Sequence, residues 1–237
     1  MDKGIIYYTD NRIEGSKIFE ESQKTILASG LPIVSCSLKP LEFGNNIVLE
    51  GRSRSYPTMA LQILIALKAS RNKYVFFCEH DVLYHPSHFD FIPEKDDVYY
   101  YNVNNWRWDY PKDRAISYDE LTSLSSLCCN RKLAIRHYRR RLKMIKKWGL
   151  DEIRSREPRW ARKFGYEPGT KKRRKGGVTD EDHIKRRSKY PNIDIRHDKT
   201  FSHPKTHLES FIHPPTNWRE VTLDQIPGWD LKTLFNL

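Results

Sequence analysis

The sequence is poor in cysteine, and the four cysteines that it has form no ligand or disulfide pattern. They stand at positions 36, 78, 128 and 129 of 237 residues, and no two of them are spaced as a C-x-x-C pair. This spacing argues against a structural zinc site and against a disulfide framework. Thiols within expected strands fit a reducing compartment, so we expect a cytoplasmic protein.

Long apolar runs are also missing. No run approaches the roughly 18 residues that a membrane-spanning helix requires, and the first apolar stretch is shorter than a secretory signal needs. Neither G-x-G-x-x-G nor G-x-x-x-x-G-K occurs, so dinucleotide-binding and P-loop functions have no support. We therefore expect no transmembrane segment and no signal peptide.

Positive charge is abundant but unevenly placed. The formal net charge is +12, and residues 131–175 hold 19 of the 42 Lys and Arg residues against four acidic residues. Such a basic segment indicates a polyanionic partner, which could be nucleic acid, acidic headgroups or a phosphorylated substrate. The alternative is a solvated helix face followed by a loop that binds nothing.

Strands and helices alternate through the first half of the chain. A helix is expected from Lys17 to Ser29, with Ser16 as its cap, and another after Pro57. Apolar runs typical of buried strands occur at Gly4–Tyr8, Pro32–Ser37, Ile47–Leu49, Tyr74–Cys78 and Val98–Val103. This alternation predicts an α/β fold with a mostly parallel sheet flanked by helices. Such sheets bind ligands at the carboxyl ends of their strands.

The basic segment begins as an amphipathic helix. One apolar stripe and a terminating Gly149 predict a helix over residues 131–148; the stripe consists of Ile135, Tyr138, Leu142 and Ile145. Residues 154–177 are rich in Arg, Lys, Pro and Gly and are expected to form a long loop. Residues 200–237 show few periodic signals, and we expect an extended C-terminal tail there.

Glu79-His80-Asp81 is the clearest candidate for chemistry. Its two carboxylates are two residues apart and directly follow a buried strand, so both can face one cation. Oxygen ligands of this kind suit Mg²⁺ or Mn²⁺, which could neutralise a diphosphate. The alternative is a strand-end pair of acids held by backbone N–H groups or by arginine. A zinc site at His80, His85 and His88 is disfavoured, because Pro86 interrupts the segment and no helix presents the imidazoles.

Together with the segments around it, Glu79-His80-Asp81 makes the sequence resemble glycosyltransferases with the GT-A fold, in the broad family-2-like group. The resemblance lies in the first strand, in Arg52-Ser53-Arg54, in Tyr56-Pro57-Thr58 and the helix after it, and in YVFFCEHDVLYHP, which is similar to a strand followed by Asp-x-Asp. Glu79 departs from that pattern, because it replaces the first Asp. The chain also resembles uncharacterised phage and metagenomic glycosyltransferase-like proteins, which share runs such as YYTDNR, CEHDVLYHPSHFDF, GYEPGT and PNIDIRH. The resemblance is good over residues 3–105, looser to roughly residue 200, and fades in the tail.

The resemblance implies a binding site for a nucleotide-sugar, with UDP as the expected nucleotide. Thr9, Asp10 and Arg12 would hold the base and the ribose. Arg52 or Arg54 would contact the diphosphate, and guanidinium groups near a helix N-terminus suit phosphate on physical grounds as well. The alternative for both arginines is a solvated surface position.

The same resemblance implies a Mn²⁺ or Mg²⁺ cofactor. Asp81 would be the principal ligand, with Glu79 assisting and His80 between them beside the donor. His197 stands where many of these enzymes place a late third ligand, and imidazole binds Mn²⁺ as carboxylates do. The alternative for His197 is a structural role.

A transferase that inverts the sugar needs a carboxylate as general base, to take the proton of the acceptor hydroxyl. Glu167 lies in the turn-rich GYEPGT, and Asp182 lies in a Thr-Asp-Glu-Asp run that resembles the Glu-Asp motif of family-2 enzymes. The alternatives are a turn residue and a helix cap. Glu167 is favoured, because its motif recurs in the relatives that the chain resembles. A retaining mechanism would need neither.

The favoured acceptor is a hydroxymethylated pyrimidine in DNA of the kind that phages modify. A flipped base would enter the site, and phosphates would meet the basic residues Arg139, Arg140, Lys171, Lys172, Arg173, Arg174 and Lys175. One alternative is a transferase acting on a surface glycan or a lipid-linked sugar at an anionic membrane. Another is a nucleic-acid-binding protein of the same fold without turnover. Trp106 and Trp108 could stack on a sugar or base, or could pack in the core.

We therefore predict one α/β domain of GT-A (Rossmann-like) type over residues 1–237. Residues 1–105 would bind the nucleotide-sugar, 106–200 would form the acceptor side with the basic insertion, and 201–237 would be a C-terminal extension. The predicted activity is metal-dependent transfer of a sugar to an acceptor hydroxyl in the cytoplasm, or in the host cytoplasm if a phage encodes the protein.

Overall fold

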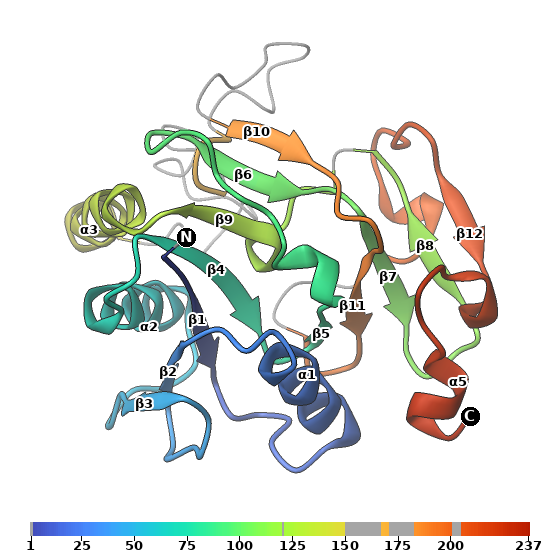
Figure 1. Ribbon diagram of the computed structural model, residues 1–237, viewed down its shortest axis with the longest axis horizontal. Coiled ribbons are helices and arrows are strands. Elements are labelled where there is room, and N and C mark those ends of the chain that lie inside the picture. Colours follow the sequence, from blue (N-terminus) through green and yellow to red (C-terminus); the bar gives the residue numbers. More distant parts are fainter. Residues whose placement is uncertain (1, 120, 150–166, 171–182, 201–204) are drawn as a thin grey trace.

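The computed structural model describes residues 2–119, 121–149, 167–170, 183–200 and 205–237 (Figure 1). Within these ranges a seven-stranded sheet has the order β10-β6-β9-β4-β1-β2-β3. Its strands are β1 (Lys3–Thr9), β2 (Ile33–Ser37), β3 (Asn45–Val48), β4 (Tyr74–Glu79), β6 (Tyr99–Asn102), β9 (Leu127–Asn130) and β10 (His183–Arg186). β1 pairs in parallel with β2 and β4, β2 with β3, and β10 with β6. The predicted α/β class with a mostly parallel sheet is confirmed.

Only β9 runs against its neighbours in this sheet, since it is antiparallel to both β4 and β6. The predicted strand bounds hold to within one or two residues. The expected third strand begins earlier, at Asn45, because polar residues at a sheet edge carry no apolar signal. The division of the chain into donor, acceptor and C-terminal parts stays a prediction.

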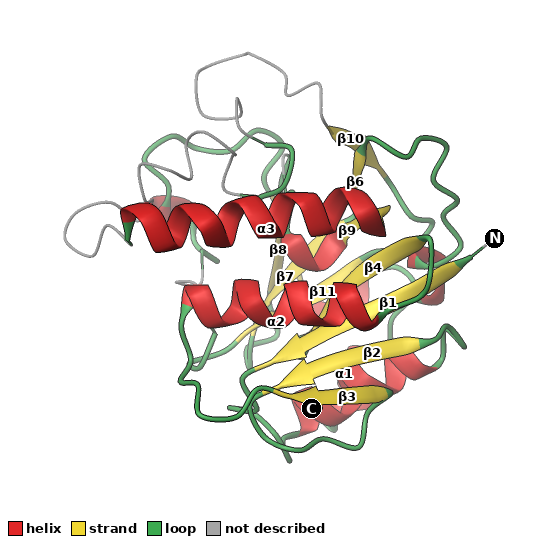
Figure 2. Ribbon diagram, turned by 90° about the vertical axis from the view of Figure 1, so that its left-hand side faces the viewer, coloured by secondary structure: helices red, strands yellow, loops and turns green. Residues whose placement is uncertain are grey.

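Three long helices cover the two faces of the sheet: α1 (Lys17–Leu27), α2 (Tyr56–Ala69) and α3 (Arg131–Trp148). α2 and α3 lie side by side on one face, and α1 lies on the other (Figure 2). Alternation along β1 decides which side chain meets which helix, because Ile6 packs in the core beneath α2 and α3 while Ile5 packs with α1. Among the described helices none is long and apolar enough to cross a membrane.

The helix ends follow the predicted local chemistry. The Ser16 hydroxyl accepts from the amide of Phe19 at 3.3 Å, as the predicted cap of α1. α3 spans the predicted residues, and it stops at Gly149, whose φ of 69° lies in the region that favours glycine. α1 ends two residues before the predicted Ser29.

A second sheet of five strands was not predicted from the sequence. Its order is β12-β8-β7-β11-β5, and its strands are β5 (Val82–Leu83), β7 (Asn105–Asp109), β8 (Ala115–Ser117), β11 (Asn192–Arg196) and β12 (Arg219–Val221). The expected extended tail is wrong in part, because β12 is an edge strand of this sheet and the short α5 (Leu231–Phe235) packs against the sheet. Trp108 is fully buried there and Trp106 nearly so, which excludes them from stacking on a ligand and favours the core alternative.

The short β5 has a particular consequence for the arrangement of the site. It follows β4 after a turn at residues 80–81 and pairs antiparallel with β11, where Leu83 faces Ile193. The amide of Ile195 also donates to the backbone carbonyl of Asp81 at 2.9 Å. The segment after β4 is thereby fixed against the end of β11, more than a hundred residues further along the chain.

Candidate functional site

A pocket lies at the carboxyl ends of β1 and β4, beside the first turns of α2. It is formed by three segments of the sequence, and its lining residues are Tyr8, Thr9, Asp10, Arg54, Ser55, Thr58, Met59, Gln62, Glu79, His80 and Asp81. This is the edge at which open α/β sheets bind ligands. The structure therefore brings together Thr9-Asp10 and Glu79-His80-Asp81, as predicted from strand ends, with Arg54, which the resemblance had implied as one of two arginines.

Of the three predicted arginines near this pocket, Arg54 is the one that lines it. Its Nε lies 2.5 Å from Asp10 Oδ2, and its Nη2 donates to the carbonyl of Lys199 at 3.3 Å. Arg52 is exposed two residues earlier. Arg12 is also exposed, and its Nε is 3.9 Å from Asp10. Arg54 is thus the one of these three arginines whose side chain lines the pocket.

Two residues that the sequence analysis did not single out hold the end of β1. Asn11 is buried with φ of 58°, and its side-chain oxygen accepts from the amides of Leu38 and Lys39 at 2.9 and 3.0 Å. Gln62 is buried in α2, and its Nε2 donates to the carbonyls of Thr9 and Cys36 at 2.8 and 3.1 Å. A lone glutamine within the otherwise apolar run MALQILIAL was the signal available in the sequence.

Glu79 lines the pocket and contacts two tyrosine hydroxyls. The Tyr8 hydroxyl donates to Glu79 Oε1, and the Tyr84 hydroxyl accepts from the Glu79 amide at 3.0 Å. Burial, and next the negative charge of Asp81, raise the pKa of Glu79 to about 8. Burial and the nearby charge of Asp81 therefore both favour the protonated form of Glu79.

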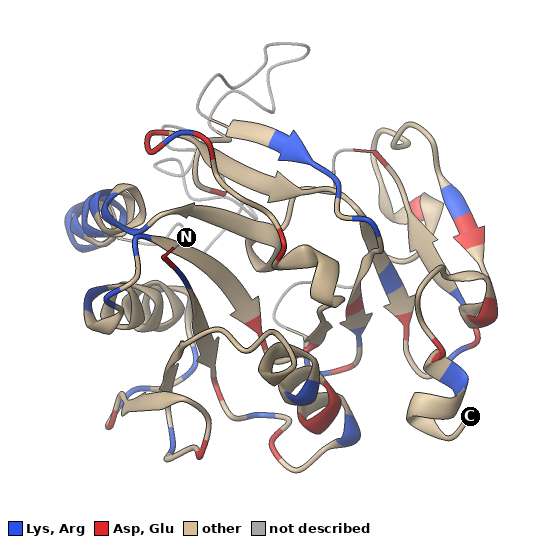
Figure 3. Ribbon diagram, viewed as in Figure 1, with Lys and Arg blue, Asp and Glu red and all other residues tan. Residues whose placement is uncertain are grey.

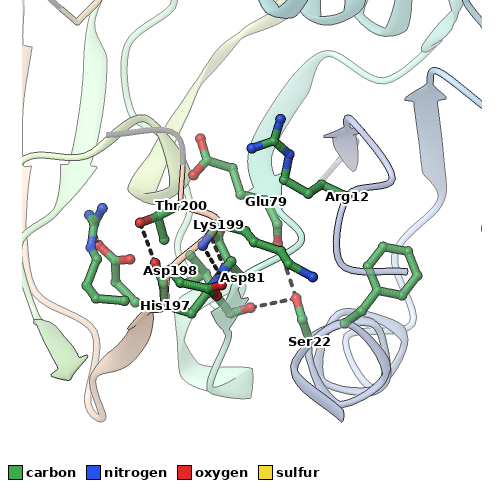
Figure 4. Close-up of polar contacts among 12 residues, drawn as sticks. Arg12, Ser22, Glu79, Asp81, His197, Asp198, Lys199 and Thr200 are labelled. Carbon is green, nitrogen blue, oxygen red and sulfur yellow. Dashed lines mark hydrogen bonds and ion pairs between the residues drawn. The ribbon is translucent and has the colours of Figure 1, made fainter. Parts of the chain in front are cut away.

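Asp81 is paired with the predicted late ligand. His197 Nε2 lies 3.7 Å from Asp81 Oδ2, and the two side chains face each other in Figure 4. The amide of Lys199 donates to His197 Nδ1 at 3.2 Å, which directs Nε2 toward Asp81. Burial alone would raise the pKa of Asp81, but the contact with His197 and the neighbouring positive charges hold it below its ordinary value. Asp81 is therefore the ionised member of the carboxylate pair.

Asp81 and His197 are the pair of predicted ligands that the structure brings together. Adjacent ligand atoms of an octahedral Mg²⁺ at about 2.1 Å lie about 3 Å apart, so the 3.7 Å between Asp81 Oδ2 and His197 Nε2 would have to shorten around a cation. His197 Nε2 would also have to give up the proton that it carries while Nδ1 accepts from the Lys199 amide. The predicted set of three ligands is not assembled, because no group of three His, Cys, Asp or Glu side chains in the described ranges could hold a metal. Mg²⁺ is commonly held by one or two carboxylates together with substrate phosphates, so a site with few protein ligands is compatible with this cation.

The alternative zinc site does not form. His88 is fully buried, and its Nδ1 meets the side-chain amides of Asn102 and Asn192 at 3.1 and 3.0 Å. His85 instead contacts Ser87, with its Nδ1 3.0 Å from that hydroxyl. These histidines are separate structural residues.

One of the two candidate bases lies within the described residues. Glu167 begins a turn in which its carbonyl accepts from the Thr170 hydroxyl at 2.8 Å, and the Tyr101 hydroxyl anchors the turn through the carbonyl of Pro168 at 2.6 Å. The charge of Glu167 is among the causes that raise the pKa of Glu79, so it lies within electrostatic reach of the pocket. Asp182 lies outside the described residues.

The predicted basic surface is described in part. Arg139 and Arg140 are exposed on α3, and Lys and Arg gather along this helix in Figure 3. Arg141 was not singled out in the sequence and is buried, where it donates to the Tyr56 hydroxyl and, at 2.9 Å, to His137 Nε2. Lys171, Lys172, Arg173, Arg174 and Lys175 lie outside the described residues.

Comparison with known proteins gives distant structural likenesses. No family model matches the chain, and no curated protein matches it. A glycosyltransferase involved in the glycosylation of the major capsid of PBCV-1 is similar with a TM-score of 0.45 and 9% identity, over 79% of this chain and 82% of that one. The bifunctional IspDF from Campylobacter jejuni is similar with a TM-score of 0.36 and 13% identity, over 58% of this chain and 43% of that one.

Proposed function

We propose that the protein is a glycosyltransferase that takes a sugar from a nucleotide-sugar donor, with UDP as the expected nucleotide. The observation that carries the proposal is the meeting of Thr9-Asp10, Arg54 and Glu79-His80-Asp81 in one pocket. These segments lie far apart in the sequence, and each is one that the resemblance to GT-A enzymes associates with the donor.

The pocket offers complementary groups to the two ends of such a donor. Ser55 and Thr58 belong to the start of α2, so the positive end of that helix and the Arg54 guanidinium both favour a diphosphate. Asp10, on the other side of Arg54, has carboxylate lone pairs left to accept ribose hydroxyls. The ion pair with Asp10 keeps Arg54 directed into the pocket.

Asp81 and His197 would hold a Mn²⁺ or Mg²⁺ ion, which would neutralise the charge on the leaving diphosphate. Glu79 lies at the same edge, where its Oε1 accepts the hydrogen bond of the Tyr8 hydroxyl, and it would assist at the cation. Glu167 is our proposed base for the acceptor hydroxyl, supported by its electrostatic reach to the pocket.

DNA carrying hydroxymethylated pyrimidines is the acceptor that the basic helix favours. α3 packs along α2, and Arg141 contacts Tyr56, the first residue of α2. The exposed Lys143, Lys146 and Lys147 therefore lie toward the end of α2 that lines the pocket. A polyanion bound there would reach the donor site, and transfer would fall steeply with added salt. Salt-insensitive transfer would rule out this acceptor.

Calorimetric titration of UDP, UDP-glucose and GDP, each with and without Mn²⁺, tests the donor proposal. We expect one nucleotide to bind, and to bind more tightly with Mn²⁺. Absence of binding under every condition would contradict the transferase assignment and favour a nucleic-acid-binding protein of the same fold. In that case an Asp81→Ala variant would bind DNA as the unaltered protein does.

A further inference from the structure

A second cleft lies at the edge of the five-stranded sheet, in the part of the molecule away from α3 (Figure 1). It has a volume of about 370 Å³ and is lined by one aromatic and four polar residues, Trp218, Asp119, Arg187, Asn217 and Arg219. None of them lines the nucleotide pocket. The volume lies in the range of roughly 300 to 1,000 Å³ that is typical of small-molecule sites.

A cluster of aromatic rings supports this cleft. Tyr118 and Trp218 stack with their planes 9° apart and their centroids 5.9 Å apart, and Phe211 meets both rings edge-on at 5.3 and 5.9 Å. Arg107 fixes Tyr118, because its Nη1 donates to the Tyr118 hydroxyl at 2.8 Å. Trp218 is only half-buried. The result is a flat, pre-organised aromatic surface next to a cleft.

Both acceptors and donors surround that surface. The Asp119 carboxylate accepts from Asn217 Nδ2 at 2.8 Å, and a carboxylate has about four acceptor positions, so it can accept further bonds. Asn217 has φ of 53°, a conformation that asparagine tolerates better than most residues. Arg187 and Arg219 supply guanidinium donors. A ligand here would meet an apolar face and a rim of mixed polarity.

A saccharide ring has this chemistry. One face of the ring presents C–H groups that pack on an aromatic plane, and each hydroxyl at its rim both donates and accepts. Nucleic acid fits less well, because Asp119 lies within the cleft and repels phosphate. The lining itself carries both signs, with Asp119 beside Arg187 and Arg219, and both signs meet on β12 in Figure 3.

The cleft is connected to the nucleotide pocket by consecutive contacts. Arg107, which holds Tyr118, has its Nε 3.6 Å from Asp194 Oδ2, and the same oxygen accepts from Arg196. Arg196 directly precedes His197, which faces Asp81. A chain of contacts thus runs from Tyr118, beside the cleft, through Arg107 on β7 and Asp194 on β11 to Asp81 in the nucleotide pocket.

We propose that this cleft binds a saccharide ring of a glycan substrate. Its role as acceptor site rests on the proposed transferase function, whereas saccharide binding itself does not. If the cleft holds the acceptor, the acceptor is a glycan and DNA is replaced as the favoured substrate.

The test is titration of maltotriose, cellotriose and chitotriose into the protein, followed by calorimetry and by the indole N–H signals in NMR spectra. We expect one of them to bind, with Trp218→Ala weakening its affinity about tenfold or more, as loss of an aromatic stacking face commonly does. Trp218→Phe, which keeps an aromatic face, should retain most of the affinity. Ile212→Ala is the matched control, because Ile212 is 92% exposed on the same segment and does not line the cleft.

Two further measurements separate the possible failures. Asp119→Ala removes a polar group and leaves the aromatic cluster intact, so it should weaken binding several-fold even if Trp218→Ala does not fold. Asp81→Asn should bind the sugar unchanged while losing transfer, which distinguishes failure of the donor site from failure of the cleft. Binding of no trisaccharide, equal binding by the Trp218→Ala variant, or Trp218-dependent binding of an oligothymidylate instead would each overturn the proposal.

Discussion

Replacing Glu79 by glutamine tests the electrostatics of the pocket. Burial first, and then the charge of Asp81, raise the pKa of this carboxyl from 4.5 to about 8. Between those values the folded protein retains a proton that the unfolded chain has released. The free energy of unfolding therefore falls as the pH rises through this window, by about 1.4 kcal/mol for each pH unit. The ceiling on this loss is about 5 kcal/mol, reached above pH 8.

Glutamine keeps the shape of Glu79 and can still accept the hydrogen bond from the Tyr8 hydroxyl, but it does not ionise. We expect the unfolding free energy of Glu79→Gln, relative to the unaltered protein, to increase by several kcal/mol from about pH 5 to about pH 9. The measurement is urea unfolding followed by circular dichroism across that range, with comparison of the two curves at each pH.

Asp81→Asn is the companion variant. It removes the second-largest cause of the raised pKa, so its own stability should fall less steeply than that of the unaltered protein between pH 5 and pH 8. Parallel pH profiles for the unaltered protein and Glu79→Gln would refute this account, because they would show that Glu79 has the same affinity for protons in the folded and unfolded chains.

Three further predictions follow from single contacts. Asp81→Ala should abolish sugar transfer, a loss of at least about a hundredfold, with an unchanged circular dichroism spectrum, and turnover at the original rate would refute the proposed cation site. Arg54→Ala should weaken binding of UDP about tenfold or more in calorimetry. Arg52→Ala should bind UDP as before, because the Arg52 side chain is exposed. Equal effects of the two substitutions would show that the ion pair with Asp10 does not position Arg54. Gln62→Leu should lower the free energy of unfolding by about 2 to 4 kcal/mol, because the buried carbonyls of Thr9 and Cys36 lose their donor. An unchanged midpoint of thermal unfolding would show that these carbonyls find other partners.

The sequence by itself determined the local elements and the edge of the sheet at which the site lies. Continuous apolar runs and helix caps depend on neighbours in the chain, so β1, β4 and α3 could be placed to within a residue or two. Since parallel strands end at one edge, Thr9-Asp10 and Glu79-His80-Asp81 had to approach each other. The resemblance to GT-A enzymes added Arg54 and His197, whose positions agree with that edge.

The tertiary structure alone decided the partners of these side chains. Tyr8 and Glu79 are 71 residues apart, and the Tyr8 hydroxyl donates to Glu79 Oε1, whereas Asp81 faces His197. The expected set of three ligands is not assembled among the described residues. The second sheet was hidden for the same reason, because its strands are short and its parallel pairing of β7 with β11 joins segments separated by the basic insertion. Contacts between distant segments depend on how whole layers pack, and no local pattern records them.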